Sequence, residues 1–267
     1  MSIDYLNGGL GESGSTMKPL QDKVAIVTGG GQGLGLGISK AMAAAGAQVV
    51  ITGRDPAKLQ AAASQIGAHG LPVLTVAGDV RRRASAEQAV AATIEKFARL
   101  DILVNNAQSS KPFVPLEQID DDTIALTLES GLLGTLYFMQ ASFPHLKRQG
   151  GSIINLGSRE GVYGGQGFGI YAATKEGIRG LSRVAAREWG KFGIRVNVIN
   201  PAALTESARA FFAAHPEQEQ AYLSLIALGR LGDPQQDIGP LAVFLAGDQG
   251  RYVTGQTVNA DGGQMML

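Results

Sequence analysis

The stretch Val24-Ala-Ile-Val-Thr-Gly-Gly-Gly-Gln-Gly-Leu-Gly35 decides the fold of this chain. Its first five residues form a short apolar run typical of a buried strand, and the pattern after it predicts a helix from Gly33 to about residue 45. Glycines let the chain turn sharply, and the free N–H groups at the start of a helix attract anions. The spacing GxxxGxG departs from the strict GxGxxG fingerprint, so on this stretch alone a merely tight turn stays open. The candidate contacts for the pyrophosphate of a dinucleotide are Gly29, Gln32, Gly33, Leu34 and Gly35.

Further short apolar runs alternate with helical segments along the rest of the chain. We expect strands at 24–28, 48–52, 73–77, 101–104, 152–156, 194–199 and 257–258. We expect helices at about 33–45, 56–66, 84–98, 120–147, 170–191, 205–227 and 235–246. Continuous apolar strands that alternate with helices predict a parallel sheet covered on both faces. The sequence therefore predicts an α/β, single-domain, doubly wound Rossmann-type fold over residues 20–267, after a flexible extension of residues 1–19.

Composition limits the classes of function. The 267 residues include 23 Lys+Arg and 23 Asp+Glu, so net charge gives no reason to expect binding of nucleic acid or an anionic membrane surface. The cluster Arg81–Arg83 is better explained as a solvated loop or helix start. The chain has no cysteine and only three scattered histidines, which predicts neither a disulfide nor a metal site. No apolar run suffices for a membrane span and no signal-peptide core is visible, so we predict a cytoplasmic protein.

Tyr171-Ala-Ala-Thr-Lys175 carries the chemistry, with Ser158 thirteen residues upstream. On a helix, residues four apart lie on one face, so the phenol and the ammonium are neighbours. An adjacent ammonium favours the phenolate, and we therefore expect Lys175 to lower the pKa of Tyr171. Tyr171 is the candidate general acid/base.

The end of the second expected strand, Val49-Val-Ile-Thr-Gly-Arg-Asp55, bears on cofactor choice. A carboxylate there would bind a ribose 2′-hydroxyl, whereas a guanidinium suits a 2′-phosphate. Arg54 thus favours NADP(H). The uncharged Gln32 speaks against it, and Asp55 leaves NAD(H) possible.

From Lys23 to about Gly263 the chain resembles the classical short-chain dehydrogenases/reductases. The motifs that match in order are the glycine turn, Asp79-Val80, Asn105-Asn106-Ala107, Ser158, Tyr171-xxx-Lys175, Arg195-Val-Asn197 and Asp261-Gly-Gly263. The resemblance implies an oxidoreductase that transfers a hydride between NADP(H) and a carbonyl or secondary alcohol. It implies that Tyr171 exchanges the proton, that Lys175 holds the nicotinamide ribose, and that Ser158 hydrogen-bonds the substrate oxygen. Further cofactor contacts implied by the resemblance are Asp79, Val80, Asn105, Ala107, Pro201 and Leu204.

The chain departs from the family pattern at three places. Gly131 stands where the family has a helical asparagine that helps to hold a proton-relay water, and Gln108 replaces the glycine of Asn-Asn-Ala-Gly. Thr205 comes one residue early, so Glu206 takes the usual threonine position. These departures keep open a nucleotide-binding protein with vestigial catalysis. A second alternative is an NAD-dependent dehydrogenase of a sugar, polyol or dihydrodiol.

Residues 204–228 are the expected substrate lid, and their aromatic and aliphatic side chains suit an apolar or cyclic ketone or alcohol. Tyr163 and Phe168 are expected to face the same small-molecule pocket, with Phe113 a weaker candidate. The expected helices 120–147 and 170–191 are apolar around most of their circumference. Such helices need burial on two sides, which predicts a homo-oligomer, either a dimer or a tetramer.

Overall fold

A computed structural model describes residues 17–68 and 70–266. Its strands form one seven-stranded parallel sheet in the order β3-β2-β1-β4-β5-β6-β7. The strands are β1 (Val24–Thr28), β2 (Gln48–Gly53), β3 (Val73–Ala77), β4 (Ile102–Asn105), β5 (Gly151–Leu156), β6 (Ile194–Pro201) and β7 (Thr257–Ala260). The predicted doubly wound parallel sheet is confirmed.

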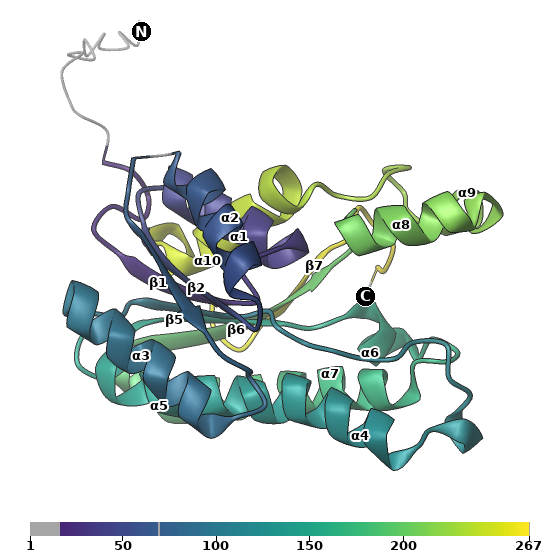
Figure 1. Ribbon diagram of the computed structural model, residues 1–267, viewed down its shortest axis with the longest axis horizontal. Helices are drawn as coiled ribbons and strands as arrows, with labels where there is room; N and C mark the ends of the chain where they lie inside the picture. The colour runs from purple at the N-terminus through teal and green to yellow at the C-terminus, as the bar shows by residue number, and fades with distance from the viewer. Residues whose placement is uncertain (1–16, 69, 267) are drawn as a thin grey trace, which may run out of the picture.

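Helices cover both faces of the sheet (Figure 1). On one face lie α1 (Gly33–Ala44), α2 (Pro56–Gly67) and α10 (Gly239–Ala246); on the other lie α3 (Arg83–Phe97), α5 (Gly134–Leu146) and α7 (Gly169–Trp189). Alternate residues of β1 serve the two cores: Ala25 and Val27 pack with the first group, and Val24 and Ile26 with the second. Both faces are apolar because both are buried.

The strand order reverses between β1 and β4, which are hydrogen-bonded neighbours. From β1 the chain winds outward through β2 and β3, and then returns to add β4 to β7 on the other side. At such a switch point the loops that follow the two central strands diverge and leave a crevice at the carboxyl edge. The glycine turn after β1 and the Asn105-Asn106-Ala107 segment after β4 meet there.

The predicted helix 120–147 is interrupted. It consists of α4 (Asp121–Leu128), a π-helical turn (Glu129–Leu133) and α5. The Ser130 hydroxyl donates to the carbonyl of Leu126 at 2.6 Å, and such back-bonding competes with the helical ladder and bends it. Hydrophobic periodicity alone does not reveal this interruption.

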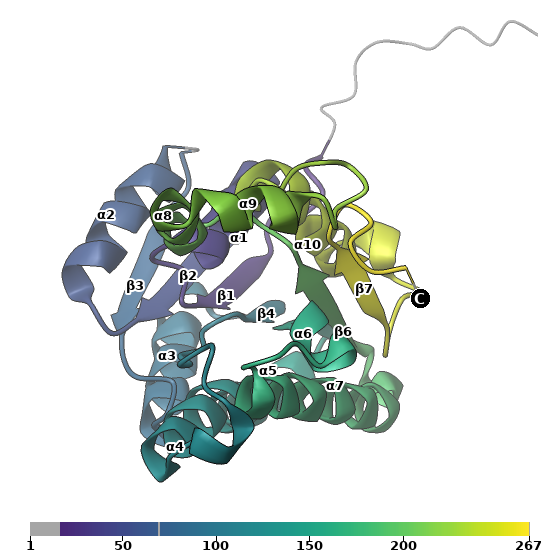
Figure 2. The same cartoon turned by 90° about the vertical axis from the view of Figure 1, so that its right-hand side faces the viewer.

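The predicted helix 205–227 is two helices, α8 (Glu206–Ala214) and α9 (Pro216–Leu223). Pro216 has no N–H to continue the first helix, so the chain breaks at His215 and restarts. Both helices lie beside the carboxyl ends of the central strands, at the right of Figure 1 and across the front of Figure 2. The five-residue helix α6 (Arg159–Tyr163) was not predicted, and α10 follows a π-helical turn (Pro234–Ile238). Three 3-10 turns complete the described elements: Leu116–Gln118, Gly190–Phe192 and Asp248–Gly250.

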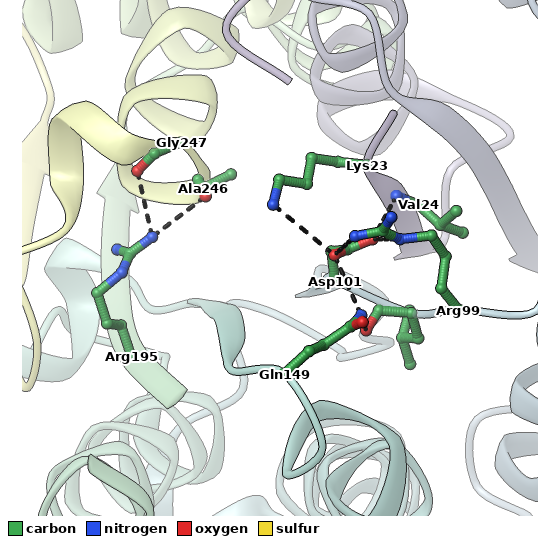
Figure 3. Close-up of polar contacts among 9 residues, drawn as sticks. Lys23, Val24, Arg99, Asp101, Gln149, Arg195, Ala246 and Gly247 are labelled. Atoms are coloured by element: carbon green, nitrogen blue, oxygen red, sulfur yellow. Dashed lines mark hydrogen bonds and ion pairs between the residues drawn. The ribbon is translucent and has the colours of Figure 1, made fainter. Parts of the chain in front are cut away.

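A polar network surrounds Asp101 at the amino-terminal ends of the central strands, opposite their carboxyl ends (Figure 3). Asp101 follows α3 and directly precedes β4. Its carboxylate accepts from the Val24 N–H at 2.9 Å and from two nitrogens of Arg99 at 2.8 and 2.6 Å. Gln149 adds a contact of 3.2 Å and Lys23 one of 3.9 Å. Nearby, Arg195 on β6 donates to the last carbonyls of α10, including Ala246 at 3.1 Å and Gly247 at 3.3 Å.

The predicted N-terminal extension is described only from residue 17 onward. Residues 1–16 of the predicted extension lie outside the described residues, whereas Leu20 is fully buried in the core. The predicted division into extension and single domain stays a prediction. No helix in the described ranges is both long enough and apolar enough to cross a membrane.

Candidate cofactor and catalytic site

A cavity of about 540 Å³ opens at the switch point. Of the residues predicted from the glycine turn and the end of β2, it is lined by Gly29, Gln32, Gly33, Leu34 and Arg54. Of those predicted later in the chain, it is lined by Asp79, Val80, Ala107, Tyr171, Lys175 and Pro201. The fold thus collects residues from across the chain into one site. The predicted residues that do not line it are Gly35, Asn105, Ser158 and Leu204.

The glycines of the turn have different tasks. Gly29 (φ +66°) and Gly33 (φ +53°) adopt left-handed backbone, which a side chain would strain. A Cβ on Gly35 would stand 2.3 Å from the Gly29 carbonyl oxygen and 2.5 Å from Asn106 Nδ2. Gly35 therefore permits close packing behind the cavity wall. A cradle of bare backbone at a helix start fits a pyrophosphate.

Thr28, which sequence analysis did not select, joins the two central loops. Its hydroxyl accepts from the N–H groups of Asn106 and Ala107, both at 3.0 Å, and its carbonyl accepts from Asn106 Nδ2 at 2.9 Å. Asn105 instead points into the protein, where it donates to Asn155 Oδ1 at 2.8 Å. Asn105 thus ties β4 to β5 behind the cavity.

A pair of cations stands at the end of β2. Arg54 and Lys58 both line the cavity, and Lys58 Nζ donates to Gln32 Oε1 at 3.2 Å. The carboxylate of Asp55 is engaged as the N-cap of α2, where it accepts from the N–H groups of Ala57 at 2.9 Å and Lys58 at 3.2 Å. Lys58 was not predicted from the sequence. Its position four residues after Arg54, in the helix that follows, could have indicated a second cation at the same site.

Asp79 and Arg81 form the adjoining wall. Arg81 donates to Asp79 Oδ2 through Nε at 2.9 Å and Nη2 at 2.6 Å. The hydrogen bond from Arg81 lowers the pKa of Asp79, although burial opposes the shift. Arg81 also lines the cavity. Arg82 occupies the N-cap position of α3, without a side-chain hydrogen bond to it, and Arg83 is the first residue of that helix.

The three predicted catalytic residues lie on neighbouring elements. Ser158 follows β5 and caps α6, with its hydroxyl accepting from the Glu160 N–H at 3.1 Å, and its side chain interacts with that of Tyr171 on α7. Lys175, one turn along α7, donates from Nζ to the Leu156 carbonyl at 2.7 Å. Its Nζ lies 5.5 Å from the centre of the Tyr171 ring.

The expected lowering of the Tyr171 pKa by Lys175 is not found. Burial raises the pKa of Tyr171, the hydrogen bond with Ser158 partly opposes this, and Glu160 and Tyr222 raise it further. Burial also lowers the pKa of Lys175 to about 7. Withdrawal from water penalises both charged forms, and the Lys175 ammonium is directed at a carbonyl rather than at the phenol.

The altered segment after Pro201 still reaches the site. Thr205, although one position early, lines the cavity, and its hydroxyl accepts from the Ala208 N–H at 3.3 Å to cap α8. Glu206, in the usual threonine position, is exposed. The Leu204 N–H donates to the Gly232 carbonyl at 2.8 Å.

A row of aromatic rings extends from Tyr171 to the expected lid. Tyr171 lies 5.8 Å from Phe168, Phe168 lies 5.2 Å from Phe113, and Phe113 lies 5.8 Å from Phe211 of α8, measured between ring centres. Phe113, the weakest aromatic candidate in the sequence, is central to this row. It has a φ of +63°, which is uncommon for a bulky residue.

Comparison with known proteins agrees with this geometry. The family model described as Enoyl-(Acyl carrier protein) reductase matches residues 29–265. The chain is 43% identical over 248 residues to a 12alpha-hydroxysteroid dehydrogenase of a Clostridium species, covering 90% of this chain and 96% of that protein. It is 35% identical to an L-rhamnose 1-dehydrogenase (NAD(P)(+)) of Azotobacter vinelandii, covering 91% and 97%.

Solved structures agree as well. A crystal structure titled as a putative short-chain alcohol dehydrogenase from Sinorhizobium meliloti superposes with a TM-score of 0.88 at 33% identity, covering 93% of this chain and 98% of that one. Family match, relatives and fold all point the same way. The chain belongs to the short-chain dehydrogenase/reductase family and is an NAD(P)-dependent oxidoreductase.

Proposed function

We propose that this enzyme interconverts a bulky apolar or cyclic ketone with its secondary alcohol, prefers NADP(H), and uses Tyr171 as the general acid/base. The observation that carries the proposal is the position of Tyr171. Tyr171 lines the same cavity as the glycine turn, it interacts with the Ser158 side chain, and it begins the aromatic row.

The roles follow from the contacts. The nicotinamide, when bound, supplies or accepts the hydride. In the reductive direction Tyr171 gives its proton to the carbonyl oxygen, and the raised pKa keeps the phenol protonated for this task. The Ser158 hydroxyl donates to the same oxygen as negative charge develops on it. Lys175, held by the Leu156 carbonyl, presents its remaining N–H groups to the cofactor ribose.

Preference for NADP(H) is supported by Arg54 and Lys58, two cations beside a carboxylate already used as a helix cap. Arg54→Ala and Lys58→Ala should each raise KM for NADPH by about tenfold or more, because a charge-assisted hydrogen bond is lost. KM for NADH should change little. Lys40→Ala is the matched control, since Lys40 bonds Gln65 away from the cavity. A larger kcat/KM of the wild type with NADH than with NADPH would contradict the assignment.

The aromatic row supports a bulky apolar substrate, and the name of the 43% identical relative suggests a hydroxysteroid as the first class to try. The sugar dehydrogenase among the relatives keeps a polar substrate as the competing outcome. A turnover screen of steroid, cyclic and aryl alcohols, the matching ketones, and sugars with both cofactors decides between them. Turnover restricted to sugars would overturn the proposed substrate class.

The acid/base assignment is tested with Tyr171→Phe. This variant should lose measurable turnover while its Kd for NADPH, read from fluorescence, stays near that of the wild type. Wild-type turnover in Tyr171→Phe would remove Tyr171 from the mechanism. Binding of NADPH by the wild type without turnover of any compound in the screen would instead favour vestigial catalysis.

We also infer a cytoplasmic homo-oligomer that associates through the outer faces of α4, α5 and α7, which lie side by side in Figure 1. The side chain of Val184 on α7 is 52% exposed, and Ala173 and Gly180 on the same helix are exposed as well. Light scattering should give a dimer or tetramer, and Val184→Glu should shift it toward the monomer. A monomeric wild type at micromolar concentration would contradict this inference.

A further inference from the structure

Gln108 and Gly131, which the sequence presents as two separate departures from the family pattern, are in contact. A Cβ placed on Gly131 would stand 3.0 Å from Gln108 Cδ and 3.1 Å from Gln108 Nε2. The carboxamide of Gln108 therefore occupies the space into which an asparagine side chain at position 131 would extend. Position 131 lacks the amide of an asparagine, and the Gln108 side chain places an amide in the same space.

The Gln108 amide is also chemically incomplete. Both Nε2 and Oε1 are buried, and neither has a hydrogen-bond partner among the described residues. A buried amide left without partners costs about 1–3 kcal/mol per group. Its carboxamide can donate two hydrogen bonds and accept two, which suits it to hold a water molecule.

The neighbourhood indicates what this water would serve. Gln108 lines the same cavity as Lys175, and the Cβ position of Gly131 lies 2.5 Å from Cγ2 of Thr174, the residue before Lys175 on α7. Oxidation of an alcohol by NADP⁺ sends the hydride to the nicotinamide and leaves one proton, which must pass from Tyr171 to solvent. Lys175 is buried, so a proton that reaches its surroundings needs a path out.

We propose that Gln108 is a positioning residue that holds, with its carboxamide, a water molecule through which this proton leaves and enters the site beside Lys175. The amide itself does not change protonation; it fixes the water between the lysine and the solvent path. This inference rests on the proposed reaction and extends it. A chain that lacks the helical asparagine thereby retains a relay, supplied from the loop after β4.

Gln108→Met tests the role of the amide, because methionine has a similar unbranched length but lacks its donors and acceptor. We expect kcat to fall by about tenfold or more, within the range of proton-transfer contributions, while KM for NADPH changes little. The solvent deuterium isotope effect on kcat should rise as proton transfer becomes limiting. Wild-type kcat in Gln108→Met overturns the proposal.

A second set of variants moves the amide back to the helix. Gln108→Gly with Gly131→Asn and Thr174→Ser removes the glutamine, places an amide at 131, and deletes the methyl group that would collide with it. Thr174→Ser keeps the hydroxyl that donates to the Ile170 carbonyl at 2.8 Å. This triple variant should regain most of the kcat lost in the background pair Gln108→Gly/Thr174→Ser. A triple variant no faster than that background overturns the proposal.

Thermal unfolding of the ligand-free protein gives a readout independent of turnover. If the amide holds a water, Gln108→Met should leave Tm unchanged or lower it. If the amide has no partner, its removal should raise Tm by several degrees, at about 2–4 °C per kcal/mol, and the proposal fails. Failure of the proposed function is distinguishable, because it would appear as an inactive wild type in the substrate screen.

Discussion

At the scale of single residues, the site works by burying groups that ordinarily stay in water. Lys175 is 5% exposed, with one carbonyl partner in the described chain. Its burial lowers its pKa to about 7. The buried position of Lys175 is therefore unfavourable for stability, which is common at functional sites.

Lys175→Met should abolish turnover yet raise the free energy of unfolding near pH 7. The folded pKa of about 7 lies below the ordinary value of 10.5, so between these values the unfolded chain binds more protons. Wild-type stability from this group therefore rises with pH across that window, and the penalty is complete below about pH 7. The Tm advantage of Lys175→Met should shrink from pH 7 to pH 10. Exposed Lys96→Met is the control, and parallel curves for wild type and Lys175→Met would contradict the prediction.

Gln108 shows what could not be predicted at this scale. The sequence marks positions 108 and 131 as unusual, but they are 23 residues apart and lie on a loop and a π-helical turn. The Ser109 N–H, next to Gln108, donates to the Ser130 hydroxyl, next to Gly131, at 2.9 Å, and this long-range contact brings the amide to the glycine. That Ser158, Tyr171 and Lys175 lie on neighbouring elements was predictable, because four-residue helical spacing fixes two of them and motif order indicates the third, whereas their catalytic roles stay a prediction.

At the scale of elements, the aromatic row links the loop before α4, the start of α7 and α8, which lies in the predicted lid. Phe113 stacks on Phe211 with an interplanar angle of 15° and contacts Phe168 edge-on. The Phe113 side chain is 59% exposed, and its left-handed backbone packs against Gly167, where a Cβ would stand 2.7 Å from Phe113 Cα. Sequence patterns predicted the lid, but not which ring outside it would meet α8.

Phe113→Gly and Phe113→Ala separate the ring from the backbone. Both lose the aromatic surface, so both should raise KM for an apolar substrate by about tenfold. Left-handed backbone costs a non-glycine residue about 1–2 kcal/mol, so the glycine variant should be the more stable of the two. Steady-state kinetics and thermal unfolding measure the two effects. An unchanged KM in both variants would show that the row does not bind substrate.

At the scale of the whole molecule, strand alternation and motif order were enough to predict the sheet and its helical layers. Local irregularities were not predictable in the same way. The π-helical turn carries a serine back-bond, and α6 begins at the cap that Ser158 provides. Both follow from hydrogen bonds that periodicity does not encode, and both adjoin the site.

The network around Asp101 should make the opposite edge of the sheet a determinant of stability and not of catalysis. The Asp101 side chain is 7% exposed, and its partners come from the segment after α3, the start of β1 and the segment before β5. Asp101→Ala leaves the buried Val24 N–H without its acceptor, which costs about 1–3 kcal/mol, whereas the loss of the pair with the partly exposed Arg99 adds less than about 1 kcal/mol. Urea unfolding should register that loss, while kcat per folded molecule stays at the wild-type value because the cavity lies at the other edge.

Lys23→Ala is the matched control, since its contact of 3.9 Å joins a partly exposed ammonium to the same carboxylate and should contribute less than about 1 kcal/mol. Equal losses in the two variants would show that the network stabilises the protein through surface charge alone, with no contribution from the buried hydrogen bonds.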